Sequence, residues 1–162
     1  WTLTPDEDLS HLGPEPLSGD FTAPWLHAAL GRRKRHLKPL LLDQSFLAGL
    51  GNIYVDEALH VAGLHPLISA SRVSKAKAIK LHGAIQQILT EAIRREGSSF
   101  DGFYTTPEGN PGAYQHQFLV YGRQGLPCGS CGRRLIKMVV AQRGTHLCTS
   151  CQRAPRKPIP RG

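Results

Sequence analysis

The four cysteines of this 162-residue chain form two pairs, and each pair has two residues between its members. Cys128 pairs with Cys131 and Cys148 pairs with Cys151, with sixteen residues between the pairs. Each C-x2-C turn brings two thiolates to one side of the chain, so two such turns can close a tetrahedral shell around one ion. We therefore predict one structural Zn²⁺ with all four thiolates as ligands and no open position for water.

Other uses of four cysteines are possible on sequence alone. Two disulfides in a secreted domain are one alternative, although C-x2-C spacing at both ends favours a metal. An iron ion in the same shell, in a small redox protein, is another. His146 precedes the second pair, and we expect it to be a bystander because four cysteines already fill the shell.

The residues between the two pairs have the pattern of a β-hairpin. An apolar and β-branched run at 135–140 predicts one strand, residues 142–144 predict the turn, and residues 145–147 predict the returning strand. Two short strands are not stable alone in water, so the metal is expected to hold them. This predicts a zinc finger over residues 126–153.

The charge of the chain points to a polyanionic partner. The net charge is +8 with a pI near 9.7, and all 20 Lys and Arg lie in residues 32–162 together with only seven of the 12 acids, a net charge of +13 there. Such a balance favours nucleic acid, the alternative being a merely basic surface. No apolar run reaches the length of a membrane span, and there is no signal peptide, so we expect a cytoplasmic protein without a membrane partner.

The region between the acidic start and the cysteines is predicted to be mainly α-helical. A helix at 21–30 has Thr22 as its N-cap, and a leucine-rich helix at 40–42 is followed by glycine-rich turns. A further helix at 53–62 stops at Gly63, which gives the order helix, turns, helix.

The start of the helix at 53–62 is a candidate anion site. The first amides of a helix have no internal partner, and the helix dipole adds positive potential there. Gly51 would let a phosphate approach closely, and Asn52 would either cap the helix or give its NH₂ group to a phosphate.

The longest predicted helix covers residues 74–96, with Ser74 as its cap and Gly97 at its end. Its apolar residues recur at spacings of three and four and are assigned to the core: Ile79, Ile85, Ile88, Leu89, Ala92 and Ile93. Residues 98–125 are rich in glycine and aromatics and predict a functional loop and connector, with a short strand at 118–121.

Both ends of the chain are expected to lie outside the folded module of residues 21–97. Residues 1–20 are acidic and read as a linker from a missing upstream domain, since the chain begins at Trp1 and its single methionine is Met138. Residues 154–162 contain three prolines and three cations and predict a disordered tail.

Three stretches together resemble the bacterial formamidopyrimidine-DNA glycosylases: LLLDQSFLAGLGNIYVDEALHVAGLHP, VYGRQGLPCGSC and VVAQRGTHLCTSCQR. The likeness covers roughly residues 19–153 and is to the C-terminal half of such an enzyme, a helix-two-turn-helix module followed by a β-hairpin zinc finger. It implies base-excision repair, in which the damaged nucleotide is flipped out of the duplex. It also implies removal of 8-oxoguanine and formamidopyrimidines, followed by strand cleavage through β,δ-elimination.

The resemblance implies that the catalytic residues lie elsewhere. The family nucleophile is the amine of an N-terminal proline, assisted by a glutamate, and this chain has no such stretch because it begins at Trp1. The chain alone is therefore expected to lack glycosylase and lyase activity. A free-standing zinc-ribbon binder of nucleic acid, without catalysis, is the alternative.

The same resemblance assigns residues that contact damaged double-stranded DNA, bound by a monomer on the bacterial nucleoid. Asn52, with Gly51 beside it, matches a phosphate contact in the helical module, and Arg143 matches the contact made by the hairpin. Lys38 and Tyr121 match residues near the bound phosphates. The loop that covers the flipped base matches Ser99, Phe100, Asp101, Gly102, Phe103 and Tyr104.

Overall fold

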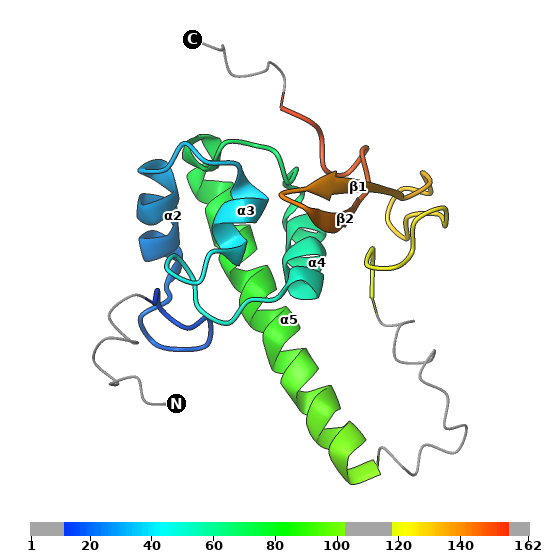
Figure 1. Cartoon of the computed structure of the whole chain (residues 1–162), viewed down its shortest axis with the longest axis horizontal. Coiled ribbons are helices and arrows are strands. Elements are labelled where there is room, and N and C mark those ends of the chain that lie inside the picture. Colours follow the sequence, from blue (N-terminus) through cyan, green and yellow to red (C-terminus); the bar gives the residue numbers. More distant parts are fainter. Residues whose placement is uncertain (1–11, 103–117, 156–162) are drawn as a thin grey trace.

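The fold is a group of helices followed by one small hairpin (Figure 1). The computed structural model describes residues 12–102 and 118–155, and their side chains except at 95–102. The elements are α2 (Ala23–Gly31), α3 (Leu37–Leu42), α4 (Asn52–Ala62), the 3-10 helix η1 (Ala70–Arg72), α5 (Lys75–Gly102), β1 (Ile136–Val140) and β2 (Arg143–Leu147). The predicted class, mainly α with a β-hairpin, is confirmed.

The helices share one apolar core. Helices α2 and α4 both pack on α5, and α3 packs on α4. The largest fully buried apolar side chains come from all of these helices and the segments joining them: Phe21, Leu26, Leu30, Leu37, Leu40, Leu41, Leu47, Leu50, Leu59, Leu81 and Ile85. Burial of this set is the main stabilisation of the module.

Local sequence signals fix two of the helix ends. Thr22 caps α2, since its Oγ1 accepts a hydrogen bond from the Trp25 amide at 3.1 Å. Helix α4 ends at Gly63, whose φ of +72° lies in the left-handed region. Its amide donates to the carbonyl of His60 at 3.1 Å, so the predicted stop is confirmed.

The two turns between α3 and α4 are held by side chains at their start. Asp43 accepts hydrogen bonds from the amide of Ser45 at 2.9 Å and from its hydroxyl at 2.7 Å. Gln44 Oε1 accepts from the amide of Gly49 at 2.8 Å, where φ is +90° and a side chain would be strained. The helix-two-turn-helix arrangement is thereby confirmed.

The segment before α2 packs on these turns. Gly13 donates its amide to Gln44 O at 2.9 Å, and Pro14 O accepts from the amide of Ala48 at 3.0 Å. A Cβ on Gly13 would lie 2.1 Å from the carbonyl oxygen of Phe46, so only glycine allows this approach. Within the predicted linker of residues 1–20, the described part from 12 onward is therefore ordered against the helical module.

Helix α5 differs from its prediction in length. It continues to Gly102 and does not stop at Gly97. A glycine inside a helix costs only about 1 kcal/mol, so it does not by itself end one. Residues 99–102 are consequently helical, where a loop was expected, and Phe103 and Tyr104 lie outside the described residues.

The buried face of α5 also differs from its prediction. Ile79 and Ile93 are 51% and 58% exposed, and the core positions are instead filled by Ala78, Leu81 and Ala84 beside Ile85. The sequence shows two overlapping apolar stripes, and only the packing of α2 and α4 decides which of them is covered.

Strands β1 and β2 form an antiparallel pair, with Val140 opposite Arg143. The turn consists of Ala141 and Gln142, with φ of 52° and 66°. Two left-handed residues in a two-residue loop make a type I′ turn. The turn was predicted at 142–144, which is wrong: it lies at 141–142, because Arg143 already begins β2.

Two other expectations concern the ends of the hairpin region. Residues 118–121 form a bend and turn, not the predicted strand. Of the predicted tail, residues 156–162 lie outside the described part of the chain. No helix within 12–102 and 118–155 is long and apolar enough to cross a bilayer.

Candidate metal centre and nucleic-acid interface

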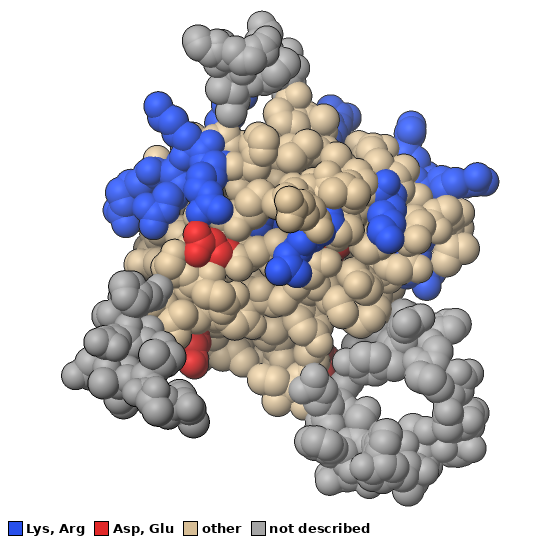
Figure 2. Space-filling model, in the orientation of Figure 1, with Lys and Arg blue, Asp and Glu red and all other residues tan. Residues whose placement is uncertain are grey.

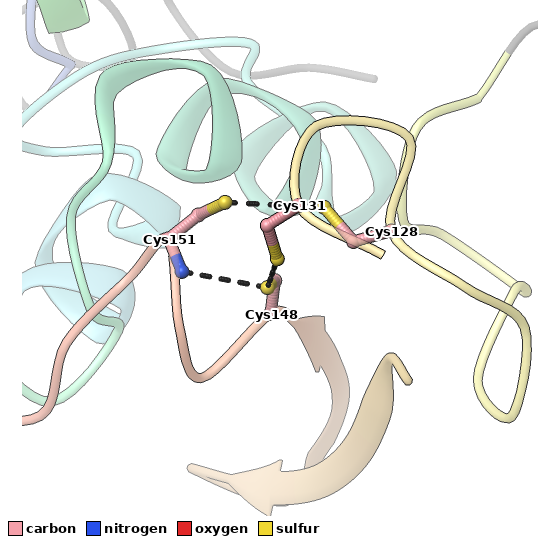
Figure 3. A group of neighbouring side chains, drawn as sticks. All are labelled: Cys128, Cys131, Cys148 and Cys151. Atoms are coloured by element: carbon pink, nitrogen blue, oxygen red, sulfur yellow. Dashed lines mark hydrogen bonds between the residues drawn. The ribbon is translucent and has the colours of Figure 1, made fainter. Parts of the chain in front are cut away.

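The four cysteines converge at the end of the hairpin opposite the turn (Figure 3). All four Sγ atoms lie within 4.8 Å of one another, with Cys128 and Cys151 3.9 Å apart and Cys131 and Cys148 3.5 Å apart. A tetrahedron with Zn–S bonds near 2.3 Å places its sulfurs about 3.8 Å apart, so the arrangement fits zinc. It excludes disulfides, whose sulfurs lie about 2.05 Å apart.

Backbone amides point at two sulfurs of this centre, whereas burial and the neighbouring cysteines raise the pKa of Cys151 to about 12. The amide of Ser130 donates to Cys128 Sγ at 3.3 Å, and the amide of Cys151 donates to Cys148 Sγ at 3.4 Å. A backbone hydrogen bond at Arg133 lowers the pKa of Cys131 to about 7. The ring of His60, on α4, brings Nε2 to 3.5 Å from Cys128 Sγ, and no sequence pattern pointed to this contact.

Asn52 begins helix α4, and its side chain bonds to the hairpin. The N-cap of α4 is Gly51, whose carbonyl accepts the amide of Val55 at 3.0 Å, so Asn52 is the first helical residue and not the cap. Its Nδ2 instead donates to the carbonyl of Gly144 at 3.2 Å. One Nδ2 proton serves this bond, and the amide group has a second to offer a ligand.

Lys38 is placed differently from its prediction. Its side chain is 0% exposed, and Nζ donates to Asp56 Oδ1 at 2.7 Å, Thr145 Oγ1 at 2.8 Å and Gly144 O at 3.0 Å. An ammonium group has three protons, and all three are used. Lys38 therefore has no Nζ proton left to offer a phosphate.

The environment of Lys38 shifts its pKa in both directions. Burial lowers the pKa of Lys38, and the hydrogen bond and negative charge of Asp56 oppose this effect. The positive charge of Arg143 lowers the same pKa further.

Asp56 is the residue that sequence reasoning missed. Its second oxygen, Oδ2, accepts from the amide of His146 and lies equally close to its Nδ1, both at 3.1 Å. His146 is therefore held away from the cysteines, as predicted, and its ring packs edge-on against Tyr121 with centroids 4.6 Å apart. One signal could have found Asp56: it falls at buried-face spacing from Asn52 and Leu59 within α4.

A second carboxylate of α4 organises the connector before the zinc finger. Glu57 accepts hydrogen bonds from three consecutive amides, those of Leu119 at 2.7 Å, Val120 at 2.8 Å and Tyr121 at 2.9 Å. Amides that all point at one carboxylate cannot form a strand ladder, which explains the bend at this point. Tyr121 is thereby fixed at both its amide and its ring.

Lys and Arg side chains spread over the upper part of the face shown in Figure 2, where acidic side chains are few. The run Arg32–Arg35 is exposed, and two of its members have local contacts. Arg35 pairs with Asp43 at 2.7 Å, and Arg33 lies over the ring of Phe46 at 5.4 Å. The sign of this surface suits a polyanion.

The arrangement matches a known sequence family. Residues 12–103 match the family model described as the formamidopyrimidine-DNA glycosylase H2TH domain, and residues 125–154 match the zinc finger found in FPG and IleRS. The chain belongs to the formamidopyrimidine-DNA glycosylase family. Its four cysteines are accordingly the ligands of one structural zinc, which sets aside the iron alternative.

Individual relatives agree. The formamidopyrimidine-DNA glycosylase of Desulforamulus reducens is 44% identical over 159 residues, which cover 94% of this chain and 57% of the relative. The crystal structure of MutM (Fpg) from Thermus thermophilus superposes with a TM-score of 0.76 at 48% identity, covering 89% of this chain and 55% of that one. The Lactococcus lactis Fpg in complex with abasic-site DNA gives a TM-score of 0.79 at 36% identity, covering 94% and 57%. The chain thus spans about half the length of the relatives it matches.

Proposed function

We propose that this chain is the lesion-holding half of a DNA glycosylase and AP lyase that removes oxidised purines from duplex DNA. One observation carries the proposal: helix α4 and the hairpin meet at Gly144, so that Asn52 and Arg143 lie on either side of the same short contact. Solved family members in complex with abasic-site DNA and with FAPY-dG-containing DNA support it.

The chemistry of the proposed contacts is that of phosphate binding. The amides at the start of α4 and the second Nδ2 proton of Asn52 would donate to one phosphate. Arg143, exposed at the start of β2, would donate its guanidinium fork to another. Tyr121, whose ring packs on His146 of the same strand, is proposed to lie near these phosphates. Residues 99–104 remain the proposed cover over the flipped base.

Catalysis would come from outside residues 1–162, because the proline amine and glutamate that act in the family have no counterpart among them. We expect the protein to act as a monomer on cytoplasmic nucleoid DNA. A polypeptide of these 162 residues should bind lesion DNA without cutting it, and borohydride trapping on a duplex with one 8-oxoguanine should give no covalent adduct. An adduct would show that a nucleophile lies within the chain.

Fluorescence anisotropy with labelled duplexes tests the binding proposal. The protein should bind a duplex with an abasic analogue more tightly than an intact duplex. Asn52→Ala and Arg143→Ala should each weaken abasic binding by about 1.5–3 kcal/mol, the usual value for a charged hydrogen bond. Arg94→Ala, an exposed arginine on α5, is the matched control and should change little.

Two results would contradict this assignment. Unchanged affinity in both variants, with normal zinc content, would remove the two residues from the interface. Equal affinity for abasic and intact duplexes, with a steep dependence on salt, would instead favour a zinc-ribbon binder without lesion recognition.

A further inference from the structure

We propose that the buried Lys38–Asp56 pair is a positioning device that aims the DNA contacts of the hairpin and of helix α4. Neither residue would touch DNA itself. The inference rests on the proposed function, since it concerns how the proposed phosphate contacts are held.

The pair joins three elements at one buried point. Lys38 comes from α3, Asp56 from α4, and both bond to β2, which lies beside α4 (Figure 1). Both side chains are 0% exposed, and Lys38 Nζ lies 2.7 Å from Asp56 Oδ1. Water therefore does not reach either charge, and each has protein partners for its remaining hydrogen-bonding capacity.

Each residue proposed to contact DNA is linked to this pair through one intermediate residue. The carbonyl of Gly144 accepts from Lys38 and also from Asn52. Thr145 Oγ1 accepts from Lys38 and donates to the carbonyl of Arg143 at 3.1 Å. On the other side, Asp56 holds His146, whose ring packs on Tyr121.

The zinc alone cannot fix the orientation of Arg143. Its ligand Cys148 follows directly after the end of β2, whereas Arg143 is at the start of that strand, about 17 Å away at 3.3–3.4 Å per residue. A two-stranded ribbon twists easily over such a length. The Lys38–Asp56 pair fixes the end that the metal does not reach.

An apolar pair of similar volume would avoid the cost of burying two charges. A leucine and a methionine, however, offer no directional bonds to Gly144, Thr145 or His146. The polar pair thus fixes the orientation of the strand, which an apolar pair would not.

A double-mutant cycle separates aiming from general stability. Lys38→Met/Asp56→Leu removes both charges together, so no buried charge is left alone. We expect this variant to bind the abasic duplex about 10-fold more weakly than the wild type, with one zinc per chain. In an Asn52→Ala/Arg143→Ala background the same change should alter affinity by less than about twofold, because the groups it aims are gone. The salt slope of the Lys38→Met/Asp56→Leu variant should be shallower by about one phosphate contact.

Two further proteins complete the experiment. Lys80→Met removes one exposed cation of α5 and should leave lesion affinity within about twofold. Thr145→Val keeps the Lys38–Asp56 pair but removes the hydroxyl that links Lys38 to the carbonyl of Arg143. This variant decides the question if the double variant fails to fold or to bind zinc. Thr145→Val should also bind the abasic duplex more weakly than the wild type, and this loss of affinity should vanish when Arg143 is alanine.

The possible failures are distinguishable. If the wild type shows no preference for the abasic duplex, the proposed function fails, and this inference with it. If the wild type and Arg143→Ala behave as proposed, the inference alone is overturned by wild-type affinity in the Lys38→Met/Asp56→Leu variant. A loss of affinity that persists undiminished in the Asn52→Ala/Arg143→Ala background overturns it as well.

Discussion

The carboxylate of Glu57 is expected to be one of the most important single groups for holding the zinc finger on the helical module. It is only 4% exposed and accepts hydrogen bonds from three consecutive amides of residues 119–121, which lead into the first cysteine pair. The helical core and the small finger core are separate clusters, so few apolar contacts compensate for losing this carboxylate. We predict that Glu57→Ala and Glu57→Gln both destabilise the protein, to different extents.

The expected loss follows from the burial of the three donors. The bond from Val120 is buried, and those from Leu119 and Tyr121 are half-buried. An unsatisfied buried amide costs about 1–3 kcal/mol, and a half-buried one about 0.5–1.5 kcal/mol because water replaces part of the bond. Glu57→Ala should therefore lower the free energy of unfolding by about 2–6 kcal/mol. Glu57→Gln keeps one accepting oxygen and turns an NH₂ group toward at least one amide, a loss of about 1–3 kcal/mol.

Urea denaturation followed by circular dichroism, with zinc present throughout, measures both changes. Glu15→Gln is the matched control, because this glutamate is exposed and lies outside helix α4 and the connector. It should stay within about 0.5 kcal/mol of the wild type, as surface substitutions usually do. Should Glu57→Ala unfold with the stability of the control, the three amides do not depend on this carboxylate, and the reasoning is refuted.

Three further outcomes are expected. Chelation of the zinc should melt the hairpin, while the fluorescence of Trp25 stays native because the helical core is separate; simultaneous loss of both signals would contradict this. Ala141→Asn combined with Gln142→Gly should raise the melting temperature, because it relieves two left-handed residues at about 1 kcal/mol or more each, and a lower one would count against strain. Hydrogen bonds from Ser45 and then Arg35 lower the pKa of Asp43 from 3.8 to about 2, so its stabilising contribution is present above pH 3.8 and is lost as the pH falls through 2. A carboxyl titration followed by NMR should give that pKa, and a value near 3.8 would show that these bonds do not form in solution.

The sequence predicted best where a feature depends on neighbours along the chain. The metal ligands follow from two C-x2-C turns, and the start of α2 and the end of α4 follow from Thr22 and Gly63. Each of these acts through one turn of backbone, so a short stretch of sequence contains all the information. The same local reasoning failed at Gly97, where a helix-ending signal was present and α5 continued regardless.

By itself, then, the sequence determined the family, the zinc ligands and the order of the elements. Only the tertiary structure decided what Lys38, Asp56 and Asn52 do. Lys38 bonds to residues 106 and 107 positions away, and Asn52 bonds across 92 positions. The resemblance to the family placed Lys38 near the bound phosphates. Lys38 becomes a buried anchor because folding brings one carboxylate and one strand within 3 Å of its ammonium group, where water can no longer compete.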